Sequence, residues 1–275
     1  MKITILCNDK ARRPFSSEHG FSALVETGDS SVLFDTGSSD LFLKTMKILN
    51  LNPSEIKNIV LSHGHYDHVG GLRYLRGKGD LQVWMKGSVF LPNFSGKRFA
   101  GIDWERLKGS FQLLELEGNA QKICESIFAW GPAPMVNGFE EPDPKFQVIQ
   151  GGEKRRNLFE EELNLVIERE QGLILLTGCA HRGIANIAYG AQNLFGKGIR
   201  MIVGGFHLFN ASLERIQQVI DFFNEIGVEK IVPCHCTGER AIKLFRRKFK
   251  GEVLACETGT SITVPFENKN IKGAL

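Results

Sequence analysis

Leu61-Ser62-His63-Gly64-His65-Tyr66-Asp67-His68-Val69-Gly70-Gly71 is the stretch of this chain that says most about its fold and its chemistry. Three histidines and one aspartate fall within six positions, directly after the apolar run Ile59-Val60-Leu61. Imidazole and carboxylate groups are common ligands of zinc and similar divalent ions. The stretch therefore predicts a metal site at the end of a strand.

The spacing of these ligands has a geometric reason. His63 and His65 are two residues apart, so in an extended segment their side chains point the same way. Asp67 and His68 fall where we expect the chain to turn into a helix, and there they can aim at a second point nearby. One segment can therefore supply two ligands to each of two adjacent metals. A chance cluster of exposed histidines is the alternative, but the preceding strand and the following glycines favour a site.

Length and composition indicate the number of domains and the kinds of partner to expect. The chain has 275 residues, is 42% hydrophobic and 24% charged, and carries a net charge of +3. We expect a single domain over residues 1–275 that acts on a small molecule, without nucleic-acid or membrane partners, and an oligomer stays open. The first nine residues resemble a strand rather than a signal peptide. The six cysteines are scattered, so reduced thiols in a cytoplasmic protein are expected.

Hydrophobic patterning predicts two similar halves. Each half begins with hairpin strands, at residues 21–26 and 31–35 and at residues 164–168 and 173–176, and continues with strand–helix units. We expect helices at residues 38–49, 183–194, 213–226 and 239–249. Two mixed sheets packed face to face, with helices on both outer faces, would satisfy this order, which is an αββα sandwich. Residues 87–110 and 132–144 are expected to be loops over the site.

Three further histidines follow apolar runs in the second half of the chain. His181, His207 and His235 each come where a predicted strand ends, a position that binding and catalytic groups favour in layered α/β proteins. Any one of them alone could equally be a buried histidine with an ordinary partner. Their shared position, in a chain with the cluster at His63 to His68, favours a common site.

Asp35, in Phe34-Asp35-Thr36-Gly37, also ends a strand. A metal-bound histidine usually donates its second ring nitrogen to an acceptor, and Asp35 is our candidate for that acceptor. A turn or capping aspartate is the alternative.

Together these motifs resemble the metallo-β-lactamase superfamily. The resemblance rests on His63-x-His65-x-Asp67-His68, on Phe34-Asp35-Thr36-Gly37 and on the strand-end histidines, and it runs from about residue 1 to residue 265. A narrower group is similar in four further segments. This group is named after the synthase that joins a dihydropterin to an aminobenzene ribofuranosyl phosphate. The four segments are Glu18-His19-Gly20-Phe21-Ser22, Thr177-Gly178-Cys179-Ala180-His181, Gly204-Gly205-Phe206-His207-Leu208 and His235-Cys236-Thr237-Gly238.

The resemblance implies two divalent metal ions, with zinc favoured and iron or manganese as alternatives. One ion would be held by His63, His65 and His181, and the other by Asp67, His68 and His235. Many relatives have Thr-Gly-Asp where this chain has Thr177-Gly178-Cys179, so Cys179 is either a soft ligand or a packing residue.

The resemblance also suggests roles around the metals. His207 could replace His235 as a ligand or donate a proton to a leaving group, and we favour proton donation. His19 and Ser22 are candidate substrate contacts at the rim. Thr237 and Gly238 begin a predicted helix whose free N–H groups could receive a phosphate.

A metal-dependent hydrolase is the function that we expect. A metal-activated hydroxide, oriented by Asp67, would attack an ester or phosphoester of a phosphorylated or pterin-like small molecule. One alternative is a synthase that joins a dihydropterin diphosphate to an aminobenzene ribofuranosyl phosphate and releases pyrophosphate. Another is a di-iron redox or sensing protein, because histidine and carboxylate ligands also suit iron.

Overall fold

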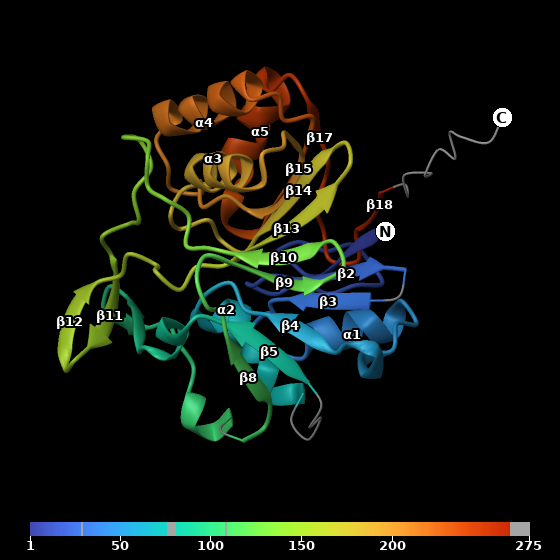
Figure 1. The fold of residues 1–275 in the computed structure, drawn as a ribbon, viewed down its shortest axis with the longest axis vertical. Coiled ribbons are helices and arrows are strands. Elements are labelled where there is room, and N and C mark those ends of the chain that lie inside the picture. The colour runs from blue at the N-terminus through green and yellow to red at the C-terminus, as the bar shows by residue number, and fades with distance from the viewer. Residues whose placement is uncertain (29, 76–80, 108, 265–275) are drawn as a thin grey trace.

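Two seven-stranded sheets lie face to face at the centre of the molecule (Figure 1). The computed structural model describes residues 1–28, 30–75, 81–107 and 109–264. The first sheet contains β18, β1, β2, β3, β4, β5 and β8, in that spatial order (Ser261–Thr263, Lys2–Cys7, Ser22–Thr27, Ser30–Phe34, Asn58–Val60, Gln82–Met85 and Gln112–Glu115). The second contains β17, β16, β15, β14, β13, β10 and β9 (Glu252–Val253, Lys230–Cys234, Ile199–Gly205, Gly172–Thr177, Asn164–Arg169, Ile127–Trp130 and Ala120–Cys124).

Helices cover the outer faces of both sheets. α1 (Leu41–Ile48) packs on the first sheet, and α3 (Ile184–Phe195), α4 (Leu213–Glu225) and α5 (Glu239–Lys248) pack on the second (Figure 1). Strand residues alternate between the two faces: Ala23 and Val25 face the other sheet, whereas Leu24 faces the α1 side. Both faces are therefore apolar. The expected αββα sandwich is confirmed.

Parallel strands bring the predicted site residues to one edge of the sandwich. β3, β4 and β5 run parallel in the first sheet, and β14, β15 and β16 run parallel in the second. The carboxyl ends of parallel strands meet at one edge, which is where ligands bind in open α/β sheets. The segments after these strands carry Asp35, His63, Cys179, His207 and His235.

A small third sheet occupies regions that the sequence does not identify. It consists of β12, β11, β6 and β7 (Glu153–Arg156, Phe146–Gln150, Asn93–Ser95 and Arg98–Phe99). The expectation of loop throughout residues 87–110 is therefore wrong, since two short strands and the 3-10 helices η3 (Gly87–Phe90) and η4 (Trp104–Leu107) lie there. β12 is exposed along its whole length, so its sequence lacks the alternation of apolar and polar residues that predicts a strand.

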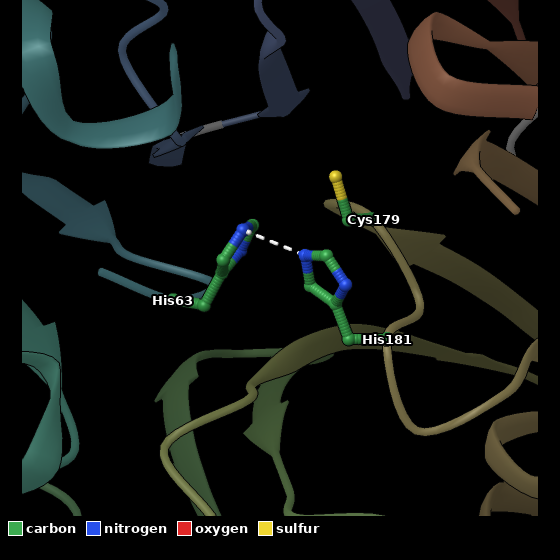
Figure 2. Close-up of side chains that lie close together, drawn as sticks. All are labelled: His63, Cys179 and His181. Carbon is green, nitrogen blue, oxygen red and sulfur yellow. Dashed lines mark hydrogen bonds between the residues drawn. The ribbon is translucent and has the colours of Figure 1, made fainter. Parts of the chain in front are cut away.

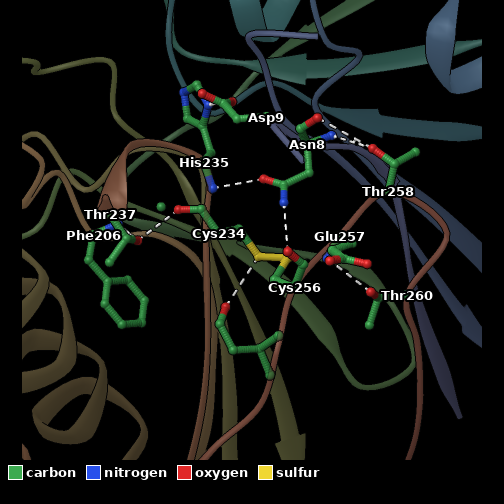
Figure 3. The surroundings of a disulfide bond; sticks show 12 residues. Asn8, Asp9, Phe206, Cys234, His235, Thr237, Cys256, Glu257, Thr258 and Thr260 are labelled. Carbon is green, nitrogen blue, oxygen red and sulfur yellow. Dashed lines mark hydrogen bonds and ion pairs between the residues drawn. A yellow bond between two sulfur atoms is a disulfide. The ribbon is translucent and has the colours of Figure 1, made fainter. Parts of the chain in front are cut away.

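The expectation that all the cysteines are reduced is also wrong. Cys234, at the end of β16, forms a disulfide with Cys256, which follows β17. Asn8 ties this region to the site, since its side chain accepts from the backbone N–H of His235 and donates to the carbonyl of Cys256 (Figure 3). The two cysteines are 22 residues apart and pair only because neighbouring parallel strands end together.

Shorter helices complete the first half. The predicted helix at Asp67 is α2 (Tyr66–Val69), which continues as the 3-10 helix η2 (Gly70–Leu75), while η1 (Pro53–Glu55) precedes β4 and η5 (His235–Thr237) follows β16. Across the described ranges of the chain, no helix is both long and apolar enough to cross a bilayer.

Candidate metal centre

All seven histidines of the chain form one connected cluster. Their ring centroids lie 4.3 to 5.1 Å apart in an unbroken series of neighbours: His19 with His235, His235 with His68, His68 with His63, and His63 with both His65 and His181, and finally His181 with His207. Histidines from both halves of the sequence therefore meet in one place.

The first group of donor atoms surrounds His63. Its Nε2 lies 3.0 Å from Nδ1 of His65 and 3.2 Å from Nε2 of His181. The Sγ of Cys179 lies within 4.8 Å of the donor nitrogens of His63 and His181. Figure 2 shows the His63 and His181 rings meeting at their ring nitrogens, with the Cys179 side chain beside them. Three imidazole nitrogens and one sulfur at these distances match the ligand types and number that zinc takes.

The second group surrounds Asp67. Its Oδ2 lies 3.4 Å from Nε2 of His235 and 3.9 Å from Nε2 of His68. Cys179 belongs to this group too, since its Sγ lies 3.2 Å from His68 Nε2 and within 4.8 Å of the donor nitrogen of His235. Cys179 thus faces both groups of donor atoms, and its role as a soft ligand stays a prediction.

The protonation states suit a metal site. Burial lowers the pKa of His63 and His181 well below the usual range and lowers that of His65 to about 3. Neutral imidazoles are the form that binds metal. Burial also raises the pKa of the Cys179 thiol, and a coordinated metal would remove that proton. The donor set therefore fits divalent ions such as zinc.

Asp35 lies behind both groups and is fully buried. Its Oδ2 accepts from Nδ1 of His68 at 2.7 Å and from Oγ of Ser62 at 2.7 Å, and Oγ of Ser62 lies 2.8 Å from Nδ1 of His63. These contacts turn Nε2 of both histidines toward the centre. The predicted contact between Asp35 and a ligand histidine is present, and its effect on a metal stays a prediction.

Asp9 provides a second such acceptor, which the sequence analysis missed. Its Oδ1 lies 2.6 Å from Nδ1 of His235, and its Oδ2 lies 3.0 Å from Nδ1 of His19. Burial lowers the pKa of His235, but hydrogen bonds to Asp67 and Asp9 outweigh burial and raise it well above the usual range. Metal binding at His235 would release that proton. In the sequence, the only indication of this role is that Asp9 comes just after the strand β1, and an ordinary turn aspartate would occupy the same position.

Glu162 and Phe159, also missed, position His181. The carboxylate of Glu162 accepts from the backbone N–H groups of His181 at 2.6 Å and of Arg182 at 3.0 Å. The Phe159 ring stacks on the imidazole of His181 with centroids 3.8 Å apart. Burial raises the pKa of Glu162 to about 7. These contacts fix the loop that carries the third ligand of the first group.

A pocket of about 850 Å³ opens onto both groups. Its size suits a small-molecule substrate. Residues 95–100 and 138–144 contribute to its wall, so parts of both predicted loop regions do reach the site. Its polar wall includes four cationic side chains, Arg98, Lys145, Arg156 and Arg215. Lys145 and Arg156 pair with Asp143 and Glu141, which line the same wall. Its aromatic wall includes Phe139, Phe146 and Phe209.

The structure places the predicted substrate-contact residues in different surroundings. His19 lines the pocket, and its Nε2 lies 3.2 Å from Oδ2 of Asp67. Its contact with a substrate stays a prediction. The placement of Ser22 is wrong, because its side chain is buried and its Oγ donates to the carbonyl of Asp35. Thr237 is also buried, and its Oγ1 donates to the carbonyl of Cys234 and accepts from the N–H of Phe206. Neither Thr237 nor Gly238 lines the pocket, so that predicted phosphate site is withdrawn.

His207 lines the pocket beside His181. Its backbone φ is 48°, in the left-handed region that costs free energy for residues other than glycine and that recurs at functional sites. Its Nδ1 is buried without a hydrogen-bond partner among the described residues. In this position His207 can either donate a proton or bind a metal.

Known proteins resemble the chain in sequence and in structure. A sequence model of the metallo-beta-lactamase superfamily matches residues 18–91. The 7,8-dihydropterin-6-methyl-4-(beta-D-ribofuranosyl)-aminobenzene-5'-phosphate synthase of Methanocaldococcus jannaschii is 31% identical and covers 95% of this chain and 96% of its own. An uncharacterized protein of that organism is 33% identical over 87% of this chain and 92% of its own.

A solved structure extends the comparison. The crystal structure of a metal-dependent hydrolase of the beta-lactamase superfamily matches with a TM-score of 0.90 and 42% identity, covering 96% of this chain and 99% of that one. The chain belongs to the metallo-beta-lactamase superfamily.

Proposed function

We propose that this protein is a metal-dependent hydrolase that cleaves an ester or phosphoester of a small phosphorylated or pterin-like molecule. One observation carries the proposal: two groups of metal-ligand atoms share Cys179 at the edge of a pocket of about 850 Å³. The 42% identical structure described as a metal-dependent hydrolase supports the same class.

In this proposal His63, His65 and His181 hold one ion and Asp67, His68 and His235 hold the other, with Cys179 between them. Two divalent ions, zinc by preference and iron or manganese as alternatives, would supply water activated at neutral pH and polarise the oxygen under attack. Asp67 orients the nucleophile, since its carboxylate lies in the pocket wall, with Oδ2 3.4 Å from Nε2 of His235. Asp35 and Asp9 hold the imidazoles that surround it.

His207 is the proposed proton donor to the leaving group. It lines the pocket, and its Nδ1 is engaged by no other described residue. Imidazole is the side chain most often used as a general acid in enzymes.

The pocket wall favours an anionic substrate that contains a ring. Arg98 is held by the hydroxyl of Tyr66 rather than by a carboxylate, so its positive charge is available to a phosphate. Phe146 and Phe139 offer flat apolar surface near the ligand groups, which suits stacking on a ring.

The experiment is hydrolysis of a chromogenic phosphodiester, bis(4-nitrophenyl) phosphate, by zinc-loaded protein and by the His65→Ala variant. His65→Ala should lower kcat/KM by about a thousandfold or more, because it removes a ligand of the first ion. Tyr189→Ala, on the exposed face of α3, is the control and should change little. Equal activity in wild type and His65→Ala would contradict the proposal.

A synthase is the second candidate, because one relative that is 31% identical over nearly the whole chain carries that name. In that reaction the ions would bind a departing diphosphate rather than activate water. Incubation with a dihydropterin diphosphate and the aminobenzene ribofuranosyl phosphate separates the two candidates. Release of pyrophosphate that requires both substrates indicates the synthase, whereas release of phosphate or alcohol from a single ester indicates the hydrolase.

A further inference from the structure

Three ligand side chains form a third group, which shares Cys179 with the two already described. The Sγ of Cys179, the Sγ of Cys236 and one ring nitrogen of His207 lie within 4.8 Å of one another. All three residues line the pocket. Each follows the carboxyl end of one of three adjacent parallel strands, β14, β15 and β16. We propose that Cys179, His207 and Cys236 form a third metal site, which takes a thiophilic ion such as Cd²⁺ or excess Zn²⁺.

The ligand chemistry supports a soft ion. Two thiolates and one imidazole, with a fourth position open to water, form a ligand set that zinc uses in proteins. Thiolates select soft metals over magnesium, calcium or manganese. A second sulfur is thus the feature that separates this site from the second group, where Cys179 joins one carboxylate and two imidazoles.

The sheet holds the three ligands in place. A Cβ added at Gly205 would lie 2.7 Å from Sγ of Cys236 and 2.4 Å from the carbonyl oxygen of Gly178, so only glycine leaves room for that thiol. The Cys236 thiol donates to the carbonyl of Cys179 at 3.6 Å, which keeps the two cysteines side by side. The three ligands thus lie within two residues of the ends of adjacent strands, which limits how far they can move apart.

His207 supplies an independent sign of a missing partner. Its Nδ1 is buried and has no hydrogen-bond partner among the described residues. Its left-handed backbone turns the side chain into the pocket rather than along the strand. The imidazole thus has hydrogen-bonding capacity to spare beside the two thiols, with one of its ring nitrogens within 4.8 Å of both.

Cys179 is shared by all three groups. The third ion would therefore compete for a thiolate that already has two neighbours, and it would sit close to two other positive charges. We expect it to bind more weakly than the other two and to be lost on dialysis.

A consequence follows for turnover, and it rests on the proposed function. An ion on His207 would occupy the imidazole that donates the proton, so thiophilic metals should inhibit hydrolysis. The inhibition would be reversed by a thiol chelator that removes only the weaker ion.

The test uses intact protein that already holds two zinc ions. Adding Cd²⁺ and recording its ¹¹³Cd NMR spectrum should show a resonance typical of two sulfur ligands, with no zinc released. Cys236→Ser and His207→Ala should each weaken Cd²⁺ binding by at least about tenfold, as expected when one of three ligands is lost. Cys124→Ser, which removes a thiol on β9 away from the site, is the control and should bind Cd²⁺ like wild type.

Three outcomes would overturn the proposal: stoichiometric release of zinc on adding Cd²⁺, a resonance with one sulfur ligand or none, or unchanged Cd²⁺ affinity in both variants. The zinc content of each variant shows whether the rest of the centre has folded. Two variants are used so that the test still stands if one of them does not fold. Because these readouts are spectroscopic, they remain decisive if no hydrolytic activity is found. Inhibition is scored separately, as the ratio of activity with and without Cd²⁺ in each protein.

Discussion

Nδ1 of His68 lies 2.7 Å from Oδ2 of Asp35, and both side chains are fully buried. A carboxylate can only accept there, so the imidazole donates from Nδ1 and keeps the lone pair of Nε2 for the centre. The same oxygen accepts from Ser62, whose Oγ reaches Nδ1 of His63. One carboxylate thus orients an imidazole in each of the two ligand groups.

Asp35 accepts three hydrogen bonds, from Nδ1 of His68 and from the Oγ and backbone N–H of Ser62. Asp35→Asn should weaken zinc binding at the second group by about 10–100-fold, since the amide cannot accept all three. The measurement is a zinc titration in competition with a chromophoric chelator. Asp40→Asn, which affects a surface pair with Lys44, is the matched control. Unchanged zinc affinity in a folded Asp35→Asn protein would show that Asp35 does not orient a ligand.

Gly178→Ala should disturb the same network by steric contact. A Cβ at this position would lie 2.2 Å from Oγ of Ser62 and 2.9 Å from Oδ2 of Asp35. Overpacking of this kind costs about 1–3 kcal/mol in the free energy of unfolding, measured by urea denaturation. Gly198→Ala is the control, because an added Cβ there meets nothing within 4 Å. Equal losses in the two variants would mean that the contact is relieved without cost.

Glu161 makes stability depend on pH. Burial raises its pKa to about 7, above the ordinary 4.5, so the folded state binds the proton more tightly than the unfolded state. Its contribution is fully present below pH 4.5 and is lost as the pH rises through 7. Between pH 5 and 8 the free energy of unfolding of the metal-free wild type should fall by about 2–3 kcal/mol more than that of Glu161→Gln. Urea denaturation that gives the same change in the free energy of unfolding with pH for both proteins would contradict this prediction.

The Cys234–Cys256 disulfide should stabilise the fold. The bond closes a loop across 22 residues, and such a crosslink contributes about 3 kcal/mol in the chain-entropy model. Cys256→Ser should show this loss in urea denaturation without reductant, whereas Cys124→Ser should not. Alkylation of the unreduced, denatured wild type should leave Cys234 and Cys256 unlabelled. Labelling of both would indicate free thiols.

The sequence predicts those parts of the fold and site whose residues are contiguous or follow apolar strands. His63, His65, Asp67 and His68 could be found because they occupy one segment, and His181 and His235 because each ends a strand. The αββα order could be found because both sheets are built from apolar runs.

Other features depend on contacts between distant segments. Asp9 reaches His235 only because β1 and β16 end at the same edge, and Glu162 reaches His181 only through the folded loop. Ser22 resembles a rim residue in sequence but points into the protein. Strand β12 of the third sheet is exposed along its whole length, so it lacks the hydrophobic periodicity that identifies strands.

The zinc content of purified protein tests the central claim most directly. Protein loaded with zinc, dialysed against zinc-free buffer and analysed by elemental mass spectrometry should retain two zinc ions per chain. His65→Ala, which removes one ligand of the first group, should retain one. Wild-type protein that keeps less than about one tenth of an ion per chain, while remaining folded, would contradict the account, since structural and catalytic zinc sites of this ligand type bind tightly at neutral pH.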